Sequence, residues 1–332
     1  MQFLLKIVTW KGIAYTIAVG SIVYGLKKYF GGGVCYCTAR LDGQVVVITG
    51  GNSGIGKALA VELVNRGATI VLACRNIEKG LEAKKHILSK NRKAKIFVKH
   101  LDLCSFSSIV KFCDTLNLEF NEIYGLVNNA GIFYHPYGIT EDGFEVTLQT
   151  NYLGPFILTH HLLKPLKQSI HARIINVASD EHRRVSINQL IAISRTQKDF
   201  KGHFVNYGAS KLALVLFTKE LAKKLQNTNV IVNAVDPGNV ETAIYRNFYP
   251  LSNPVLYALQ WIIRVVLVKT PTEGCQTLLH ALLTPNRTTG QYYADCKLAL
   301  PSPVAADERI CREYYQLTLE VLASWFSTES EC

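Results

Sequence analysis

The chain has 332 residues, of which 48% are hydrophobic and 18% are charged, and its formal net charge is +11. This composition is typical of a globular protein and excludes an intrinsically disordered or a collagen-like chain. The positive charge favours anionic partners. Because the basic residues are scattered and no nucleic-acid module is present, we expect a membrane surface or cofactor phosphates, and no nucleic acid.

The N-terminal segment Ile7–Leu26 is apolar over twenty residues apart from Lys11, which is close to the length that spans a bilayer. We therefore predict a single-pass membrane anchor within residues 1–30, followed by a linker over 31–43 that the glycines Gly31–Gly33 make flexible. A cleaved signal peptide and a peripheral helix are the alternatives. The expected location is the endoplasmic reticulum membrane, with mitochondrial and lipid-droplet membranes as alternatives.

The nine cysteines are spread along the chain, with no spacing typical of a zinc site or a disulfide framework. We therefore expect reduced, mostly buried thiols and no metal ion. Cys35 and Cys37 closely follow the apolar segment, so acylation is an alternative to free thiols there.

Strand and helix patterns alternate from residue 44 onward, which predicts a single α/β domain with a mostly parallel sheet. The predicted strands are Val45–Ile48, Thr69–Cys74, Lys95–His100, Gly125–Gly131, Arg173–Ser179 and Asn229–Val235. The predicted helices include Ile55–Leu63, Gly143–Leu163 and Tyr207–Leu225. We place the domain at residues 44–300 and a helical extension at 301–332.

The stretch "TGGNSGIGK" stands between the first strand and the first helix of this domain. A glycine turn in this position aims backbone N–H groups at a phosphate. A tight turn without a ligand is the alternative. Polar residues mark other predicted strand ends, with Asn128–Gly131 after the fourth strand and Ser179 after the fifth. Tyr207 and Lys211 are spaced to share one face of a helix.

The chain from about Gln44 to about Tyr293 resembles the short-chain dehydrogenase/reductase family. It carries "TGGNSGIG", "NNAG", "QTNYLGPF", "INVAS", "YGASK" and "DPG" in the family's order. The resemblance implies one Rossmann-type doubly wound sheet of about seven strands. The phrases "LACRN", "TEDGFE" and "SKLALVLFTKELAKKL", with the N-terminal apolar segment, look most like the retinol-dehydrogenase-like branch.

The resemblance implies a catalytic set of four residues. Tyr207 would be the general acid/base, Ser179 would hold the substrate oxygen, and Asn151 would fix a water that relays protons. The pKa of free tyrosine is roughly 10, and we expect the ammonium of Lys211 and the positive charge of an oxidised nicotinamide both to favour tyrosinate. Lys211 is also expected to bind the ribose.

The implied cofactor-binding residues are Gly50, Asn52, Ser53, Gly54, Ile55, Gly56, Arg75, Asp102, Asn129, Ala130, Gly131, Tyr207, Lys211, Pro237, Gly238 and Thr242. Helix capping is the alternative role for Asp102 and Thr242. NAD-binding sites place an acid near the end of the second strand. Here Arg75 and neutral Asn76 stand instead, so we predict that NADP(H) is favoured over NAD(H), because a guanidinium pairs well with a 2′-phosphate.

The substrate is expected to be lipophilic. The segment after "DPG", from Leu256 to Leu267, is too apolar for one helix face, which predicts a greasy pocket or membrane contact. A retinoid-like alcohol, aldehyde or ketone fits best, with a steroid or polyisoprenoid as alternative. A catalytically silent membrane-tethered scaffold is a second kind of function, and a homodimer is an alternative for the assembly.

Twenty-seven residues separate Ser179 from Tyr207, more than in many family members, and we expect this insert to form a loop beside the active site. Its His182 is predicted to pack, with a second proton donor as the alternative. Asn286 in "NRT" is a glycosylation acceptor only if its loop is lumenal.

Overall fold

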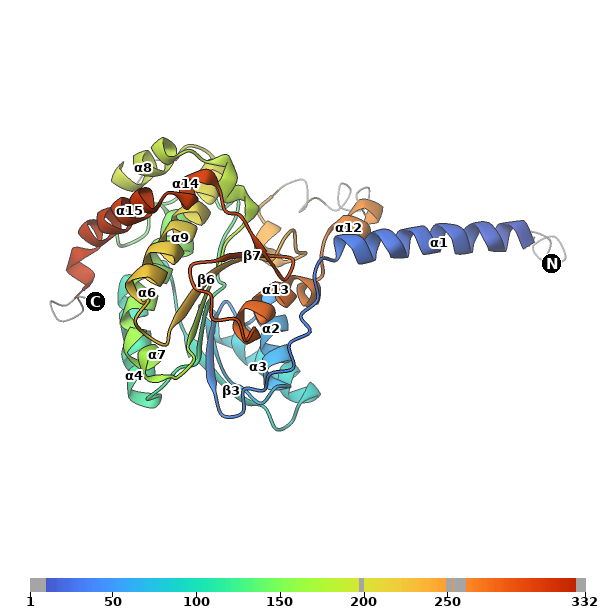
Figure 1. Cartoon of the computed structure of the whole chain (residues 1–332), viewed down its shortest axis with the longest axis horizontal. Coiled ribbons are helices and arrows are strands. Elements are labelled where there is room, and N and C mark those ends of the chain that lie inside the picture. The colour runs from blue at the N-terminus through green and yellow to red at the C-terminus, as the bar shows by residue number, and fades with distance from the viewer. Residues whose placement is uncertain (1–9, 197–199, 249–252, 254–260, 327–332) are drawn as a thin grey trace.

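An eight-stranded sheet in the order β3-β2-β1-β4-β5-β6-β7-β8 forms the centre of the computed structural model, which describes residues 10–196, 200–248, 253 and 261–326 (Figure 1). Its strands are β1 (Val45–Thr49), β2 (Thr69–Cys74), β3 (Lys95–His100), β4 (Gly125–Asn128), β5 (Arg173–Val177), β6 (Ile231–Asp236), β7 (Tyr292–Ala294) and β8 (Lys297–Ala299). Strands β1 to β7 are parallel, and β8 pairs antiparallel with β7. The predicted doubly wound parallel sheet is confirmed, with one short strand added at its edge.

Helices cover both faces of the sheet, each over its own hydrophobic core. One face carries α4 (Phe106–Glu119), α6 (Gly154–His161), α7 (Leu163–Gln168) and α9 (His203–Lys224), and the other carries α2 (Gly54–Val64), α3 (Ile77–Lys90) and α13 (Pro271–Leu283). The first strand is buried from both sides, and the β-branched run Val46, Val47 and Ile48 is fully inaccessible to solvent. Such a run is typical of a central parallel strand.

The long helix predicted over Gly143–Leu163 is interrupted. It consists of α5 (Val146–Leu148), a π-helical turn η1 (Gln149–Leu153) and α6. A π turn widens the helix by one residue and is often found at functional sites. Here it contains Asn151, whose place in the site is described below.

The insert between β5 and α9 was expected to be a loop, and this prediction is wrong for its described part. It forms the 3₁₀ turn η2 (Asp180–Arg184) and the helix α8 (Ile187–Thr196). Leu190 and Ile193, three residues apart, are fully buried in the core beside α9, and their burial accounts for the helix.

The C-terminal residues pack onto the domain. They form α14 (Pro303–Ala306), α15 (Glu308–Val321) and η4 (Ala323–Trp325). Tyr314 shares a 2.8 Å hydrogen bond with Ser194 of α8, and the Tyr315 hydroxyl lies 2.7 Å from His160 Nε2 of α6. The extension therefore completes the core on the α9 side of the sheet.

Helix α1 (Trp10–Phe30) projects away from the body (Figure 1). Large apolar side chains on it are exposed, including Ile17 and Ile22, each 62% accessible. Within the described part of the chain, none of the helices combines the length and apolarity that a bilayer-spanning segment requires. The predicted transmembrane span over Ile7–Leu26 is therefore not supported, and its residues 7–9 lie outside the described part.

The link between α1 and β1 is packed against the domain, which differs from the flexible linker predicted from its glycines. A Cβ atom on Gly33 would lie 2.1 Å from the carbonyl oxygen of Asp295, so only glycine fits there. The Lys27 ammonium, at the end of α1, lies 2.9 Å from the Glu273 carboxylate and donates to the Val268 carbonyl oxygen.

Candidate active site

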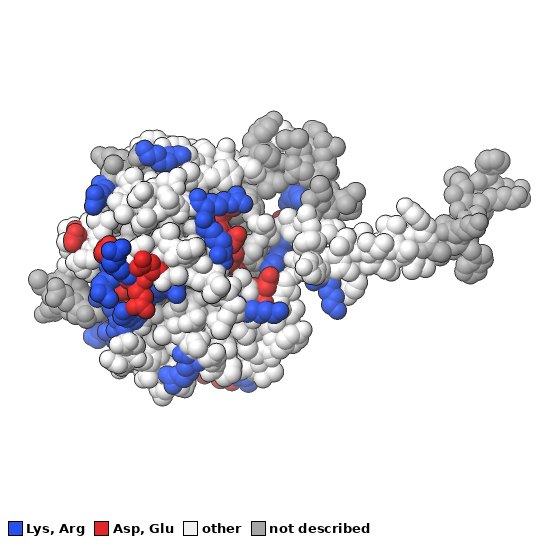
Figure 2. All heavy atoms as spheres, turned by 45° about the horizontal axis from the view of Figure 1, so that its top comes forward, with Lys and Arg blue, Asp and Glu red and all other residues white. Residues whose placement is uncertain are grey.

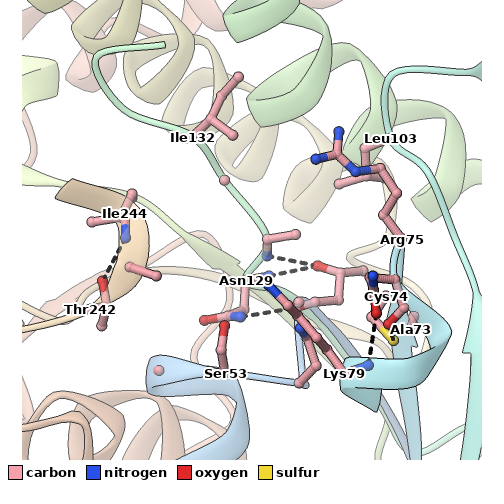
Figure 3. A pocket seen from close by; sticks show the side chains of 18 of the residues that line it. Ser53, Ala73, Cys74, Arg75, Lys79, Leu103, Asn129, Ile132, Thr242 and Ile244 are labelled. Carbon is pink, nitrogen blue, oxygen red and sulfur yellow. Dashed lines mark hydrogen bonds between the residues drawn. The ribbon is translucent and has the colours of Figure 1, made fainter. Parts of the chain in front are cut away.

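A cavity of about 660 Å³ opens at the carboxyl ends of β1, β2 and β4 (Figure 3). Strand order reverses between β1 and β4, and open parallel sheets bind ligands at such a point. Eleven predicted cofactor residues line the cavity, namely Gly50, Asn52, Ser53, Gly54, Ile55, Arg75, Asp102, Asn129, Ala130, Gly131 and Thr242. Five others do not line it, namely Gly56, Tyr207, Lys211, Pro237 and Gly238.

The glycine turn and the end of β4 are locked together by Thr49. Its hydroxyl accepts hydrogen bonds from the backbone N–H groups of Asn129 and Ala130, both at 2.9 Å, and its carbonyl oxygen accepts from the Asn129 side chain at 2.8 Å. A Cβ atom on Gly56 would lie 2.6 Å from Asn129 Nδ2, so this glycine leaves room for the lock rather than facing the cavity. Thr49 lines the cavity and was not predicted as a site residue.

The start of α2 is suited to a phosphate. In the described structure Ser53, its N-cap, makes no side-chain capping hydrogen bond, and the first turn holds no acidic residue. The backbone N–H groups and the Ser53 hydroxyl are therefore available to an anion beside the cavity.

The far end of the cavity is basic. Arg75 and Lys79, at the junction of β2 and α3, both line it (Figure 3). Lys57 on α2 lines it as well. Asn76, the residue after Arg75, caps α3 by accepting a 2.7 Å hydrogen bond from the Lys79 backbone. Sequence reasoning found Arg75 and missed the two lysines. Lys79 lies in the first turn of α3, and Lys57 directly follows "GIG". These positions next to the expected phosphate site could have indicated both lysines.

Asp102 and Thr242 both line the cavity. Thr242 is also the N-cap of η3 (Ala243–Tyr245), so its alternative role as a cap is present. Asp102 accepts a 2.9 Å hydrogen bond from the Cys104 backbone within a local turn, but it does not cap α4, whose N-cap is Ser105.

Tyr207 and Lys211 lie together near the Gly131 end of the cavity, although neither lines it. Tyr207 is 8% exposed and Lys211 is 3% exposed. The Lys211 ammonium lies 5.6 Å from the Tyr207 ring centroid and donates a 2.7 Å hydrogen bond to the carbonyl oxygen of Val177, at the end of β5. A Cβ atom on Gly131 would lie 3.6 Å from the same ammonium.

Burial dominates the electrostatics of this pair. It raises the pKa of Tyr207 well above its ordinary value; nearby Tyr245 raises it further, and a hydrogen bond with Ser179 partly opposes both effects. Burial also lowers the pKa of Lys211 to about 8, against the attraction of Asp236. Desolvation of the phenol therefore outweighs the neighbouring ammonium in setting the pKa of Tyr207, while the expected contribution of an oxidised nicotinamide stays a prediction.

Asn151 joins the loop after β4 to α9. Its side-chain oxygen accepts a 2.8 Å hydrogen bond from the Ile132 backbone, and its amide donates to the Ile132 carbonyl oxygen and to Ser210 Oγ, each at 3.0 Å. The π turn brings this side chain into reach of both elements. The hydrogen bonds explain why an asparagine, which is unfavourable in the middle of a helix, is found at this position.

Ser179 lies two residues after the end of β5, and its backbone carbonyl is bonded to His182. His182 is fully buried, its Nδ1 donates to the Ser179 carbonyl oxygen at 2.7 Å, and its Nε2 accepts from the Ser302 backbone at 3.0 Å. The packing role predicted for His182 is therefore the one observed. Pro237 and Gly238 form the turn after β6, where the Gly238 backbone donates to Asp236 at 2.8 Å.

Aromatic side chains gather beside Tyr207. The Phe133 ring centroid lies 4.9 Å from that of Tyr207, and the cluster around it consists of Tyr134, Phe204, Tyr245 and Phe248. Sequence reasoning placed the apolar wall in the segment 256–267 instead. Leu256 and Leu259 lie outside the described residues, while 261–267 forms α12 (Trp261–Leu267).

Known proteins resemble this chain along most of its length. Residues 44–250 match the family model described as short chain dehydrogenase. The chain is 40% identical to human retinol dehydrogenase 12, covering 90% of this chain and 92% of the relative, and 37% identical to human retinol dehydrogenase 11, covering 90% and 91%.

Solved structures share the fold. A crystal structure of an uncharacterized protein from Mycobacterium Paratuberculosis superimposes with a TM-score of 0.69 and 27% identity, over 88% of this chain and 98% of that one. A short chain dehydrogenase from Shigella flexneri, complexed with NADP, gives a TM-score of 0.58 and 22% identity, over 77% and 98%. At that identity the second likeness concerns the fold alone.

Proposed function

Because this chain belongs to the short chain dehydrogenase family, whose members use nicotinamide cofactors, we propose that it is an NADP(H)-dependent oxidoreductase for a lipophilic, retinoid-like alcohol and its aldehyde or ketone. The observation that carries the proposal is the buried Tyr207, with Ser179 nearby and Lys211 at its flank, next to a phosphate-suited cavity. A bound nicotinamide would supply the hydride in one direction and accept it in the other.

Tyr207 would move the proton. When a carbonyl is reduced, hydride addition to carbon leaves negative charge on oxygen, and the protonated phenol donates its proton to that oxygen. The raised pKa of Tyr207 keeps the proton in place until then. Ser179 would donate a hydrogen bond that strengthens as the charge develops. In the oxidation direction Tyr207 would first lose its phenolic proton to solvent, and the phenolate would then accept the proton of the alcohol.

Lys211 and Asn151 would position the site. Lys211 is fixed to Val177 and lies close to Gly131 at the cavity edge, where a ribose hydroxyl would be in reach. Asn151 holds Ile132, next to Gly131, against α9. Loss of either would displace the groups that the nicotinamide end contacts.

The preference for NADP(H) rests on charge. Three cations, Arg75, Lys79 and Lys57, line the far end of the cavity, and the N-cap Asn76 stands where an acid would bind a free ribose hydroxyl. Glu82 also lines this region but does not balance the three positive charges. The ratio of catalytic efficiencies with NADPH and NADH tests this preference.

A retinoid-like substrate is supported by the aromatic cluster and by the names of the relatives. Phe133 packs directly against the Tyr207 ring, and Tyr245 and Phe248 pack against Phe133. Together they offer flat apolar surfaces beside Tyr207. A long conjugated chain would stack on such surfaces better than a small polar substrate. Steroids and polyisoprenoids remain the alternative classes.

Membrane attachment is supported by the apolar surface of α1. Figure 2 shows the described part of this projection as mostly uncharged, in contrast to the body. Helix α12 packs beside α1, and its Val265 and Leu267 are 42% and 43% exposed. We propose that these apolar side chains enter a membrane, with the endoplasmic reticulum as the expected compartment.

The deciding experiment is cofactor oxidation by the full-length protein in detergent micelles. Retinaldehyde, a steroid ketone, a polyisoprenoid aldehyde and a small water-soluble aldehyde are compared at equal concentration with NADPH. We expect the highest kcat/KM with retinaldehyde. Equal turnover of the small aldehyde would contradict a lipophilic specificity, and no turnover of any of them would favour the scaffold.

A further inference from the structure

Three metal-ligating side chains meet away from the cavity, where the link between α1 and β1 crosses α13. The ligand atoms of Cys35, Cys37 and His280 all lie within 4.8 Å of one another. Cys37 Sγ is 3.9 Å from His280 Nδ1. The proposed reaction uses none of these groups. The spacing analysis missed them because His280 is distant from both cysteines in the sequence.

Contacts from several elements hold the cluster together. The Cys35 backbone donates a 3.1 Å hydrogen bond to Gln276, which lies one turn before His280 on α13. The His280 ring packs edge-on against Tyr293 of β7, with 5.8 Å between ring centroids. Two residues before Cys35, Gly33 is wedged against the β7–β8 turn. The link therefore cannot move away from α13 without breaking these contacts.

The chemistry of the set favours zinc. Two cysteine sulfurs and one imidazole nitrogen are ligands typical of Zn²⁺. Zn–S bonds of about 2.3 Å and Zn–N bonds of about 2.0 Å place tetrahedral ligands roughly 3.5 Å apart, so small side-chain rotations close the set. Cys35 is 8% exposed, while Cys37 and His280 are half-buried, which gives an ion a route from solvent.

We propose that Cys35, Cys37 and His280 form a zinc site that ties the link between α1 and β1 to α13. As each sulfur–zinc bond forms, the thiol loses its proton to solvent. Cys296 lies next to Gly33, but its sulfur is not part of the set of ligand atoms that lie within 4.8 Å of one another. We therefore assign the fourth coordination position to water. The site would hold the projecting helix α1, whose Lys27 already pairs with Glu273 of α13, in a fixed position on the body.

The test is cobalt(II) substitution in the full-length, reduced protein in detergent, after dialysis against a chelator. Tetrahedral thiolate coordination gives a thiolate-to-cobalt charge-transfer band and intense visible bands. We expect one equivalent of Co²⁺ to produce both, and one equivalent of Zn²⁺ to abolish them. Cleavage by trypsin after the exposed Arg40 should slow when Zn²⁺ is added.

Variants define the ligands. Cys37→Ser and His280→Ala should each weaken cobalt binding by at least about a hundredfold. Three controls should keep it: Cys296→Ser beside the site, Cys113→Ala in the opposite core, and His86→Ala on the surface of α3. NADPH binding shows that each variant is folded.

The wild-type spectrum is decisive even if a variant fails to fold. Octahedral, weakly coloured cobalt or no saturable binding would overturn the site. An equal loss of cobalt affinity in Cys296→Ser and in Cys37→Ser would also overturn it. The same conclusion would follow from a Cys35–Cys37 disulfide in protein isolated under reducing conditions. None of these results bears on the proposed oxidoreductase, which is measured separately by cofactor oxidation.

Discussion

The two ends of the candidate active site are built differently. At the nucleotide end, the turn after β1 and the end of β4 are joined by hydrogen bonds to the backbone and hydroxyl of Thr49. At the substrate end, Tyr207 is surrounded by aromatic side chains from separate segments, and Ser179 is supported by His182 and the C-terminal Ser302. The first end depends on a short motif, and the second depends on contacts between residues distant in the sequence.

This difference predicts that the chemistry can be removed without disturbing the nucleotide end. Tyr207→Phe deletes one oxygen atom and, with it, the group proposed to give a proton to the substrate. We expect kcat with retinaldehyde to fall by roughly a thousandfold, because general acid catalysis contributes about 10²- to 10⁴-fold. NADPH binding, followed by the fluorescence of the bound cofactor, should change little.

A matched control is Tyr124→Phe, which removes the hydroxyl of a half-buried tyrosine that donates to the Leu282 carbonyl oxygen far from the catalytic residues. It should retain nearly full turnover. If Tyr207→Phe kept its activity, the proton donor would be misassigned. If the wild type had none and both variants kept their cellular role, the scaffold would be the better account.

The charge at the nucleotide end can be tested by Arg75→Ala. A hydrogen bond to a charged group contributes about 1.5–3 kcal/mol, so we expect KM for NADPH to rise between about tenfold and a hundredfold, with KM for NADH little changed. Arg40→Ala, which removes an exposed arginine paired with Asp42, is the control and should leave both constants unchanged. An equal effect of Arg75→Ala on both cofactors would mean that the guanidinium does not bind the 2′-phosphate.

The nucleotide end could be predicted from the sequence because its determinants are local. A β-branched run, a glycine turn and a helix are contiguous from Val45 to Val64, and backbone geometry fixes where each residue faces. The lysines Lys57 and Lys79 were missed because their direction depends on how α2 and α3 pack, which a motif does not specify.

The substrate end could not be predicted to the same degree. The π turn at Gln149–Leu153 contains Asn151, which bonds to Ile132 and Ser210, both remote from it in sequence. The same holds for α8, which forms where Leu190 and Ile193 find a core. The linker glycines suggested flexibility, yet Gly33 is fixed by a turn that lies at the other end of the chain.

The exposed apolar side chains of α1, outside the active site, can be tested for membrane binding. Ile17→Glu with Ile22→Glu places two charges on exposed positions of α1 and should reduce binding to phospholipid vesicles by at least about tenfold, since each buried isoleucine contributes roughly 1.5–3 kcal/mol. Leu118→Glu, at an 88% exposed leucine on α4, is the control and should bind as wild type. Turnover of a water-soluble aldehyde should be the same in all three proteins. Equal vesicle binding would show that α1 does not attach the protein.

The smallest expected effect concerns His182 at the substrate end of the site, where we expect the folding stability to depend on pH. Burial lowers the pKa of His182, with a further decrease from Arg183, while its hydrogen bond to Ser179 and the charges of Asp180 and Asp236 partly oppose this. The folded protein therefore holds this imidazole neutral. In the unfolded chain it titrates at about pH 6.5.

The sign follows from proton uptake. As pH falls below about 6.5, the unfolded chain binds a proton that folded His182 resists, so the stability from this residue is present above that pH and is lost below it. We expect the free energy of unfolding to fall by about 1 kcal/mol more in the wild type than in His182→Gln between about pH 7.5 and pH 5, measured by urea denaturation. Glutamine can keep both backbone hydrogen bonds without titrating, whereas His171→Gln, at an exposed histidine, should retain the wild-type slope. NADPH affinity should not follow this pH dependence, because the nucleotide end does not depend on His182. A His182→Gln curve parallel to that of the wild type would show that this histidine does not couple the substrate end to pH.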